Sequence, residues 1–170
     1  MSIVNSWLPG ARVLDLFAGS GALGLEALSR GAESVDFVEI APKSLAAIAT
    51  NAERLSAAGQ ITLHRTDALR FIERVEPHAY DVAFADPPYG IGLAERLADT
   101  WREKPFAGIF GVEHAAQERI AAGDTRTTSS FKRQKGRLPC FTNRSSPEPA
   151  WPCWRSLPHP QRLKHQETQP

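Results

Sequence analysis

The fold is decided by the stretch Arg12-Val13-Leu14-Asp15-Leu16-Phe17-Ala18-Gly19-Ser20-Gly21. Residues 12–17 are mostly apolar and predict a strand, and residues 18–21 predict the tight turn that leaves it. Leucines then recur among small residues from 22 to 30, which predicts a helix that ends at Gly31. A strand, a glycine-rich turn and a helix therefore follow one another directly.

The same alternation continues along the chain to about residue 113. Further strands are predicted at 34–39, 61–64, 81–85 and 108–113, and further helices at 42–58, 67–75 and 93–102. This alternation predicts a Rossmann-like α/β fold with a mostly parallel sheet and helices on both faces. Ligands bind such a sheet beyond the carboxyl ends of its strands, so residues that directly follow strands are the candidates for a site.

The glycine-rich turn matches the pattern G-x-G-x-x-G at Gly19, Gly21 and Gly24. The pattern alone fits a dinucleotide, S-adenosylmethionine, or a turn needed only for packing. Asp15, inside the preceding strand, favours S-adenosylmethionine, because a carboxylate repels a pyrophosphate and attracts a cation. A nicotinamide-dependent oxidoreductase is therefore the weaker alternative.

Two more acidic residues stand at predicted strand ends. Glu39 ends the second strand and suits the ribose hydroxyls of either cofactor, although it also fits a solvated charge. Asp67 follows the third strand, where it can cap the next helix, accept a hydrogen bond from the adenine amine, or do both.

The fourth strand leads directly into Asp86-Pro87-Pro88-Tyr89. Two successive prolines fix both φ angles and remove two backbone donors, so this segment is a rigid rim of acceptors beside an aromatic ring. Asp86 and the Pro87 carbonyl can each accept one N–H of an exocyclic amine, and Tyr89 can stack on its base. The segment therefore predicts methyl transfer to an amino nitrogen without a metal.

These residues resemble the bacterial family that methylates the N2 amine of one guanine in small-subunit ribosomal RNA (RsmD-like). Residues 13–32 resemble its first motif, and residues 84–89 resemble its catalytic motif. The resemblance implies an S-adenosylmethionine-dependent RNA methyltransferase that acts on ribosomal RNA or the small ribosomal subunit. Related families use the second motif on adenine or glutamine, so an adenine amino-methyltransferase is an alternative.

By this resemblance the cofactor-binding residues are Asp15, Phe17, Ala18, Gly19, Gly21, Glu39, Asp67 and Asp86. The implied catalytic residues are Asp86, Pro87, Pro88 and Tyr89.

The chain departs from the family at both ends. Members begin with a basic β-hairpin arm and finish with antiparallel strands, so we expect the last strands to be lost here. Residues 1–122 carry a net charge of −5, whereas residues 123–170 carry +6 and 7 of the 13 prolines. We expect a methyltransferase domain at 1–124 and a basic, Pro-rich, disordered tail at 125–170, with an RNA-binding extension as the alternative. A catalytically impaired module that binds S-adenosylmethionine or RNA is a further alternative.

We expect a cytoplasmic protein that is a monomer. No run approaches the roughly 18 apolar residues of a membrane span, and no basic segment precedes an apolar run as in a signal peptide. Cys140 and Cys153 have no partners at metal-ligand spacing, so we expect reduced thiols and no metal site.

Overall fold

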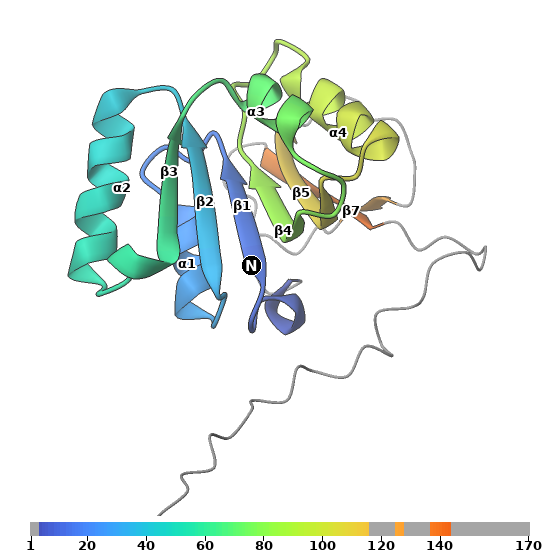
Figure 1. The fold of residues 1–170 in the computed structure, drawn as a ribbon. Helices are drawn as coiled ribbons and strands as arrows, with labels where there is room; N and C mark the ends of the chain where they lie inside the picture. Colours follow the sequence, from blue (N-terminus) through green and yellow to red (C-terminus); the bar gives the residue numbers. More distant parts are fainter. Residues whose placement is uncertain (1–3, 116–124, 128–136, 144–170) are drawn as a thin grey trace, which may run out of the picture.

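The computed structural model describes residues 4–115, 125–127 and 137–143 of the 170-residue chain. Its centre is a seven-stranded sheet in the order β3-β2-β1-β4-β5-β7-β6 (Figure 1). The first five strands are parallel to one another, and the last two are antiparallel. The strands are β1 (Arg12–Leu16), β2 (Ser34–Glu39), β3 (Ile61–Arg65), β4 (Tyr80–Ala85), β5 (Ala107–Ala115), β6 (Thr125–Thr127) and β7 (Arg137–Asn143). The prediction of a mostly parallel sheet is therefore confirmed.

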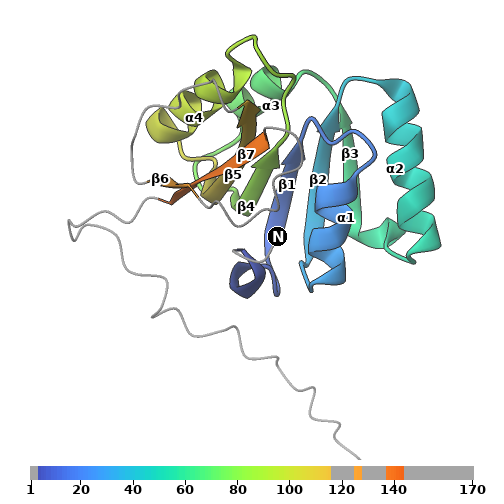
Figure 2. The same cartoon turned by 180° about the vertical axis from the view of Figure 1, so that it is seen from behind.

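Helices cover both faces of the sheet, as predicted (Figures 1 and 2). Helices α1 (Ala22–Ser29) and α2 (Pro42–Arg54) pack on one face, together with residues around the short 3-10 helix η1 (Asn5–Trp7). Helices α3 (Ala68–Arg74) and α4 (Leu93–Glu103) pack on the other. A second 3-10 helix, η2 (Ala58–Gln60), precedes β3.

The central strands are apolar on both sides because both faces are covered. Val13 of β1 points into the core under α1 and α2, whereas Leu14 and Leu16 point into the core under α3 and α4. In the core under α3 and α4, the Phe106 and Phe110 rings pack edge to face, with 5.3 Å between their centroids. This arrangement buries the strands and leaves their ends to carry polar groups.

Helix α2 ends at Arg54, four residues before the predicted end. Ser56 adopts the left-handed conformation with φ of 55°. The Ser56 N–H donates to Glu53 O, and the Ala57 N–H donates to Ala52 O, which is the pattern of a Schellman motif. Ser56 therefore ends the helix, although glycine is the usual residue in this conformation.

The expectation that the last strands are lost is wrong. Residues 137–143 pair with β5 and residues 125–127 pair with 137–143, both antiparallel. The outer edge of β5 presents backbone N–H and C=O groups that need partners, and pairing there does not depend on alternating side chains. The other residues of the predicted disordered tail lie outside the described residues.

The strand order reverses between β1 and β4, because β2 and β3 lie on one side of β1 while β4 and β5 lie on the other. In an open α/β sheet this point forms a crevice beyond the carboxyl ends of the two strands. The glycine-rich turn leaves β1 here, and Asp86-Pro87-Pro88-Tyr89 leaves β4 here. The two sequence motifs are therefore neighbours in space.

Candidate functional site

The turn after β1 is held by hydrogen bonds within the protein. The Ala18 N–H donates to Val38 O, and the Gly21 N–H donates to Ala18 O. Gly21 has φ of 81°, and a Cβ added to it would meet the Ile48 and Phe37 side chains. Glycine is therefore required at this position by both conformation and space.

Glu39 ties the end of β2 to this turn. Its Oε2 accepts from the Gly19 N–H at 2.9 Å, and its Oε1 accepts from the Ile40 and Ala41 N–H groups, each at 2.8 Å. A carboxylate has about four lone-pair sites, so these three bonds do not exhaust its capacity as an acceptor. Its predicted contact with ribose hydroxyls stays a prediction.

Asp15 is buried beneath the turn, with 1% of its surface exposed. Its Oδ2 accepts from the Gly24 N–H of α1 at 2.9 Å. Burial raises the pKa of Asp15 to about 7, and the nearby charges of Asp86 and Glu39 add to the increase. Glu39 and Asp86, joined by Asp15 once the pH exceeds its pKa, therefore create a negative field at the crevice, which favours a cation and disfavours a phosphate.

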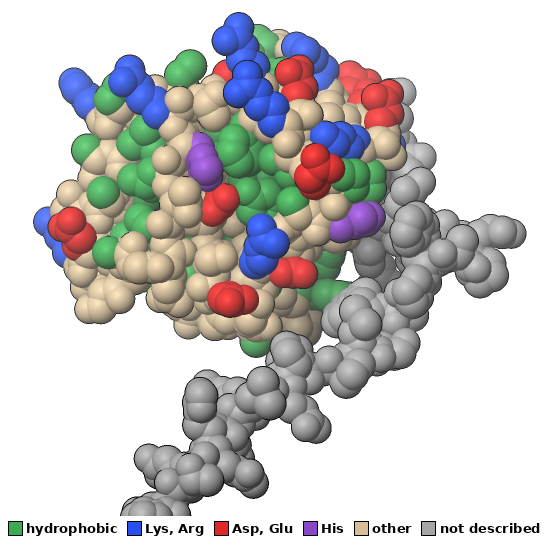
Figure 3. Space-filling model, viewed as in Figure 1, with side chains coloured by type: hydrophobic (Ala, Val, Ile, Leu, Met, Phe, Trp, Pro, Cys, Tyr) green, Lys and Arg blue, Asp and Glu red, His purple; other side chains and the backbone are tan. Residues whose placement is uncertain are grey.

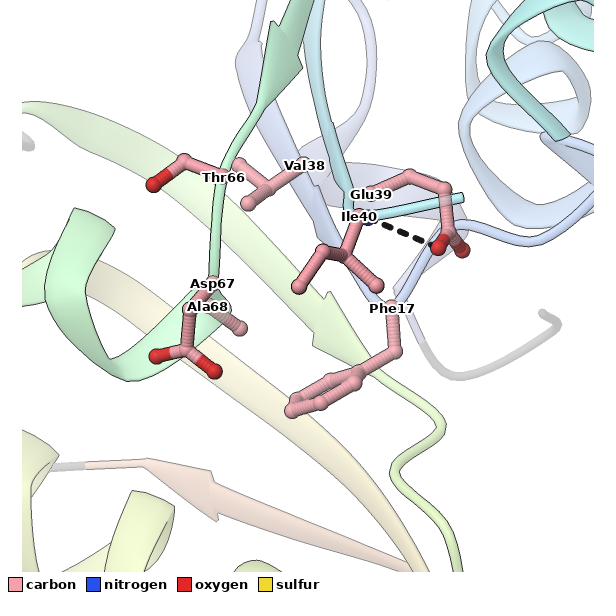
Figure 4. A pocket seen from close by; sticks show the side chains of 7 residues that line it. All are labelled: Phe17, Val38, Glu39, Ile40, Thr66, Asp67 and Ala68. Atoms are coloured by element: carbon pink, nitrogen blue, oxygen red, sulfur yellow. Dashed lines mark hydrogen bonds between the residues drawn. The ribbon is translucent and has the colours of Figure 1, made fainter. Parts of the chain in front are cut away.

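A pocket opens beyond the ends of β2 and β3 (Figure 4). It is lined by Phe17, Val38, Glu39, Ile40, Thr66, Asp67 and Ala68. In Figure 4 the side chains of Phe17, Ile40 and Asp67 surround a common space. Apolar walls with a carboxylate at each end suit a flat ring that has polar groups on its periphery.

Three of the predicted cofactor residues line this pocket, namely Phe17, Glu39 and Asp67. Asp67 is also the N-cap of α3, where its Oδ1 accepts from the Arg70 N–H at 3.0 Å. Sequence reasoning missed the other four lining residues. Their only signal was position, since each lies at the end of β2 or just after β3.

The segment after β4 brings a phenol and two carboxylates together. The Tyr89 hydroxyl lies 3.1 Å from Asp86 Oδ1 and 3.4 Å from Glu113 Oε2. Pro87 is buried and Pro88 is exposed, while Asp86 and Tyr89 are half-buried. Glu113 was not predicted as a site residue, although it lies in β5 at the same end of the sheet.

Exposed basic side chains occur at this end of the sheet. Lys43 and Arg70 lie in the first turns of α2 and α3, Arg65 ends β3, and Arg96 lies in the first turn of α4. Figure 3 shows Lys and Arg side chains gathered along the upper edge of the molecule, where these elements meet. The acidic crevice therefore has a basic rim.

Within the described residues no group of three or more His, Cys, Asp or Glu side chains could hold a metal ion. No helix in the described part of the chain is long and apolar enough to cross a membrane.

Comparison with known proteins gives consistent matches. The family model described as conserved hypothetical protein 95 matches residues 1–136. The chain is 33% identical over 116 residues to ribosomal RNA small subunit methyltransferase D of Buchnera aphidicola, which covers 68% of this chain and 60% of that protein. It is 37% identical over 118 residues to the putative rRNA methyltransferase YlbH of Bacillus subtilis, covering 66% and 64%. The chain thus spans less than two thirds of the length of these curated relatives.

Solved structures share the fold. A conserved hypothetical protein of Streptococcus pyogenes superposes with a TM-score of 0.71 at 27% identity, covering 84% of this chain and 93% of that chain. A putative methylase of Haemophilus influenzae superposes with a TM-score of 0.70 at 25% identity, covering 82% and 90%.

Proposed function

Because the chain belongs to the conserved hypothetical protein 95 family, that of the small-subunit ribosomal RNA methyltransferase D proteins, we propose that it methylates ribosomal RNA. The methyl donor is S-adenosylmethionine, and the acceptor is the exocyclic N2 amine of a guanine in small-subunit ribosomal RNA.

The pocket in Figure 4 suits the adenosine part of this cofactor. Phe17 and Ile40 offer apolar surfaces for the ring, Asp67 an acceptor for the adenine amine, and Glu39 an acceptor for the ribose hydroxyls. A pyrophosphate would fit poorly, because the N–H groups of Gly19, Gly21 and Gly24 already donate within the protein. The negative charges of Glu39 and Asp86, with that of Asp15 when it is ionised, would also repel the pyrophosphate of a nicotinamide dinucleotide.

The observation that carries the proposal is the register of Leu16 in β1 with Ala85 in β4, which sets the Asp86 carboxylate beside the start of the glycine-rich turn. When bound, the cofactor supplies a methyl group on a positively charged sulfur. Asp86 and the Pro87 carbonyl would accept the two N–H groups of the target amine and orient its lone pair. As the methyl group leaves the sulfur for the amine nitrogen, that nitrogen would release a proton, which Asp86 would accept.

Two sets of charged side chains would favour methyl transfer to RNA. The carboxylates of Glu39 and Asp86, joined by Asp15 when it is ionised, would stabilise positive charge that moves from sulfur to nitrogen. The basic rim formed by Lys43, Arg65, Arg70 and Arg96 suits the phosphates that flank a target base. A base within an RNA helix would have to be flipped out of the helix to reach Tyr89.

The test is methyl transfer from labelled S-adenosylmethionine to small ribosomal subunits that lack guanine-N2 methylation, with mass spectrometry of the nucleosides. We expect N2-methylguanosine from the wild type. Asp86→Ala should lower kcat by at least about 100-fold, since it removes an electrostatic contact made to the reacting group, while cofactor affinity stays within a few-fold. Asp99→Ala is the matched control, because it removes an exposed carboxylate from α4.

Three other outcomes would change the proposal. Undiminished turnover by Asp86→Ala would remove Asp86 from the reaction. N6-methyladenosine as the product would make the chain an adenine amino-methyltransferase. Cofactor binding with no methylated nucleoside would leave a binding module that does not turn over.

A further inference from the structure

Glu113 of β5 lies next to Asp86, which directly follows the neighbouring strand β4. Ala85 of β4 is in register with Val112 of β5, so the next residues along these parallel strands are Asp86 and Glu113. Both side chains are half-buried. The strand pairing therefore brings a second carboxylate to the segment that is proposed to hold the target amine.

Tyr89 links the two carboxylates. Its hydroxyl lies 3.1 Å from Asp86 Oδ1 and 3.4 Å from Glu113 Oε2. A phenol has one proton, so Tyr89 can donate fully to only one of them at a time. A substrate with two adjacent N–H donors could therefore engage both carboxylates while Tyr89 keeps its own hydrogen bond.

Guanine is the base that presents such donors. Its Watson–Crick edge carries N1–H next to the N2 amine, whereas adenine carries an N1 acceptor next to its N6 amine. A carboxylate beside the amine attracts N1–H and repels an N1 lone pair. Glu113 is thus suited to distinguish two bases that each carry an exocyclic amine.

We propose that Glu113 is a specificity-determining residue that selects guanine by accepting its N1–H, while Asp86 holds the N2 amine. This inference rests on the proposed function, since it takes an exocyclic amine next to Asp86 as its starting point. It adds a distinct role, because Asp86 would act on the reacting nitrogen and Glu113 on its neighbour in the ring.

2-Aminopurine tests the role of N1 directly, because it keeps the 2-amino group but has an acceptor at N1. Binding is measured for single-stranded RNA oligonucleotides of one sequence that carry guanine or 2-aminopurine at a single position, with S-adenosylhomocysteine present. Methyl transfer to the same oligonucleotides is the second readout.

We expect the wild-type chain to bind guanine about 100-fold more tightly than 2-aminopurine, since the analogue loses one hydrogen bond to a charged carboxylate. Glu113→Gln should reduce the preference to about tenfold or less, because its amide can donate to an N1 acceptor. Glu113→Asp keeps the carboxylate and should retain more of the preference. Glu95→Gln removes the same charge from an exposed position in the first turn of α4 and should leave the preference unchanged.

Tyr89→Phe separates direct from indirect action. If Glu113 contacts the base, this variant keeps the preference for guanine over 2-aminopurine even where it lowers affinity for both. If Glu113 acts only by holding the Tyr89 hydroxyl, Tyr89→Phe reproduces the effect of Glu113→Gln, and the inference is overturned.

The two readouts separate this inference from the proposed function. N2-methylguanosine formation with the same base preference in wild type and Glu113→Gln overturns the role of Glu113 and leaves the proposed function standing. A preference that depends on Glu113 in binding supports the role of Glu113 even where the wild type transfers no methyl group to the oligonucleotides, and the assay on small ribosomal subunits then decides turnover. Equal binding of both bases by the wild type overturns the inference.

Discussion

Asp15→Asn removes the charge of the buried carboxyl group while keeping its shape, and we expect its effect on stability to depend on pH. The amide oxygen of Asn can still accept the hydrogen bond from the Gly24 N–H. Burial raises the pKa of Asp15 from 3.8 to about 7, and Asp86 and Glu39 contribute to the increase. At a pH between these two values the native protein holds a proton that the unfolded chain has released.

The sign follows from this difference in proton binding. Because the native state binds the proton more tightly, the contribution to stability is complete below about pH 4 and is lost as the pH rises toward 7. One pKa unit corresponds to about 1.4 kcal/mol, so the free energy of unfolding falls by up to about 4 kcal/mol over this range. Relaxation of nearby groups makes this figure an upper limit. The Asp15→Asn variant has no carboxyl group at this position, so its free energy of unfolding should not fall in this way.

Urea denaturation followed by circular dichroism measures the free energy of unfolding of both proteins between about pH 4 and pH 8. We expect the curve for Asp15→Asn to rise relative to the wild-type curve as the pH increases, with most of the change complete near pH 7. Asp99→Asn, an exposed control on α4, should follow the wild type. Parallel curves for Asp15→Asn and wild type would show that Asp15 does not hold a proton in the native state.

Three further predictions concern local contacts. Gly24→Ala should lower the free energy of unfolding by about 1–3 kcal/mol in urea denaturation, because its Cβ would overlap the Phe37 ring; an unchanged midpoint would contradict this. Asp67→Ala should lower the free energy of unfolding by about 1 kcal/mol, because it removes the N-cap of α3. It should also weaken cofactor binding severalfold in calorimetry. Equal calorimetric affinities would show that Asp67 makes no contact with the cofactor. Tyr80→Phe removes the hydroxyl that donates to Asp36 Oδ2 at 2.6 Å, so the free energy of unfolding in thermal denaturation should fall by about 1–2 kcal/mol. An unchanged free energy would show that this hydrogen bond does not stabilise the fold.

The helices and parallel strands could be predicted from the sequence because their signals are local. Apolar runs and Gly31 located the parallel strands and α-helices of the described residues to within a few residues. The rule that ligands bind at strand carboxyl ends also identified Glu39 and Asp67, which the structure brings to one pocket.

The features that were missed depend on neighbours distant in the sequence. Ser56 takes a conformation that is uncommon for a residue other than glycine, so no residue type marked the end of α2. Pro139 lies in β7, where proline argues against a strand, yet the open edge of β5 decides the pairing. Glu113 belongs to no motif, and its nearness to Tyr89 arises only from the register between β4 and β5.

The position of β1 in the sheet has a consequence for synthesis on the ribosome. Its two partners are β2 and β4, and β4 ends about 46 residues after β2 ends. At about 5–20 residues per second, roughly 2–9 s separate the synthesis of these partners. During this interval we expect the nascent β1 strand to have a partner on one side only, with the N–H and C=O groups of its other edge accessible to chaperones or to other nascent chains.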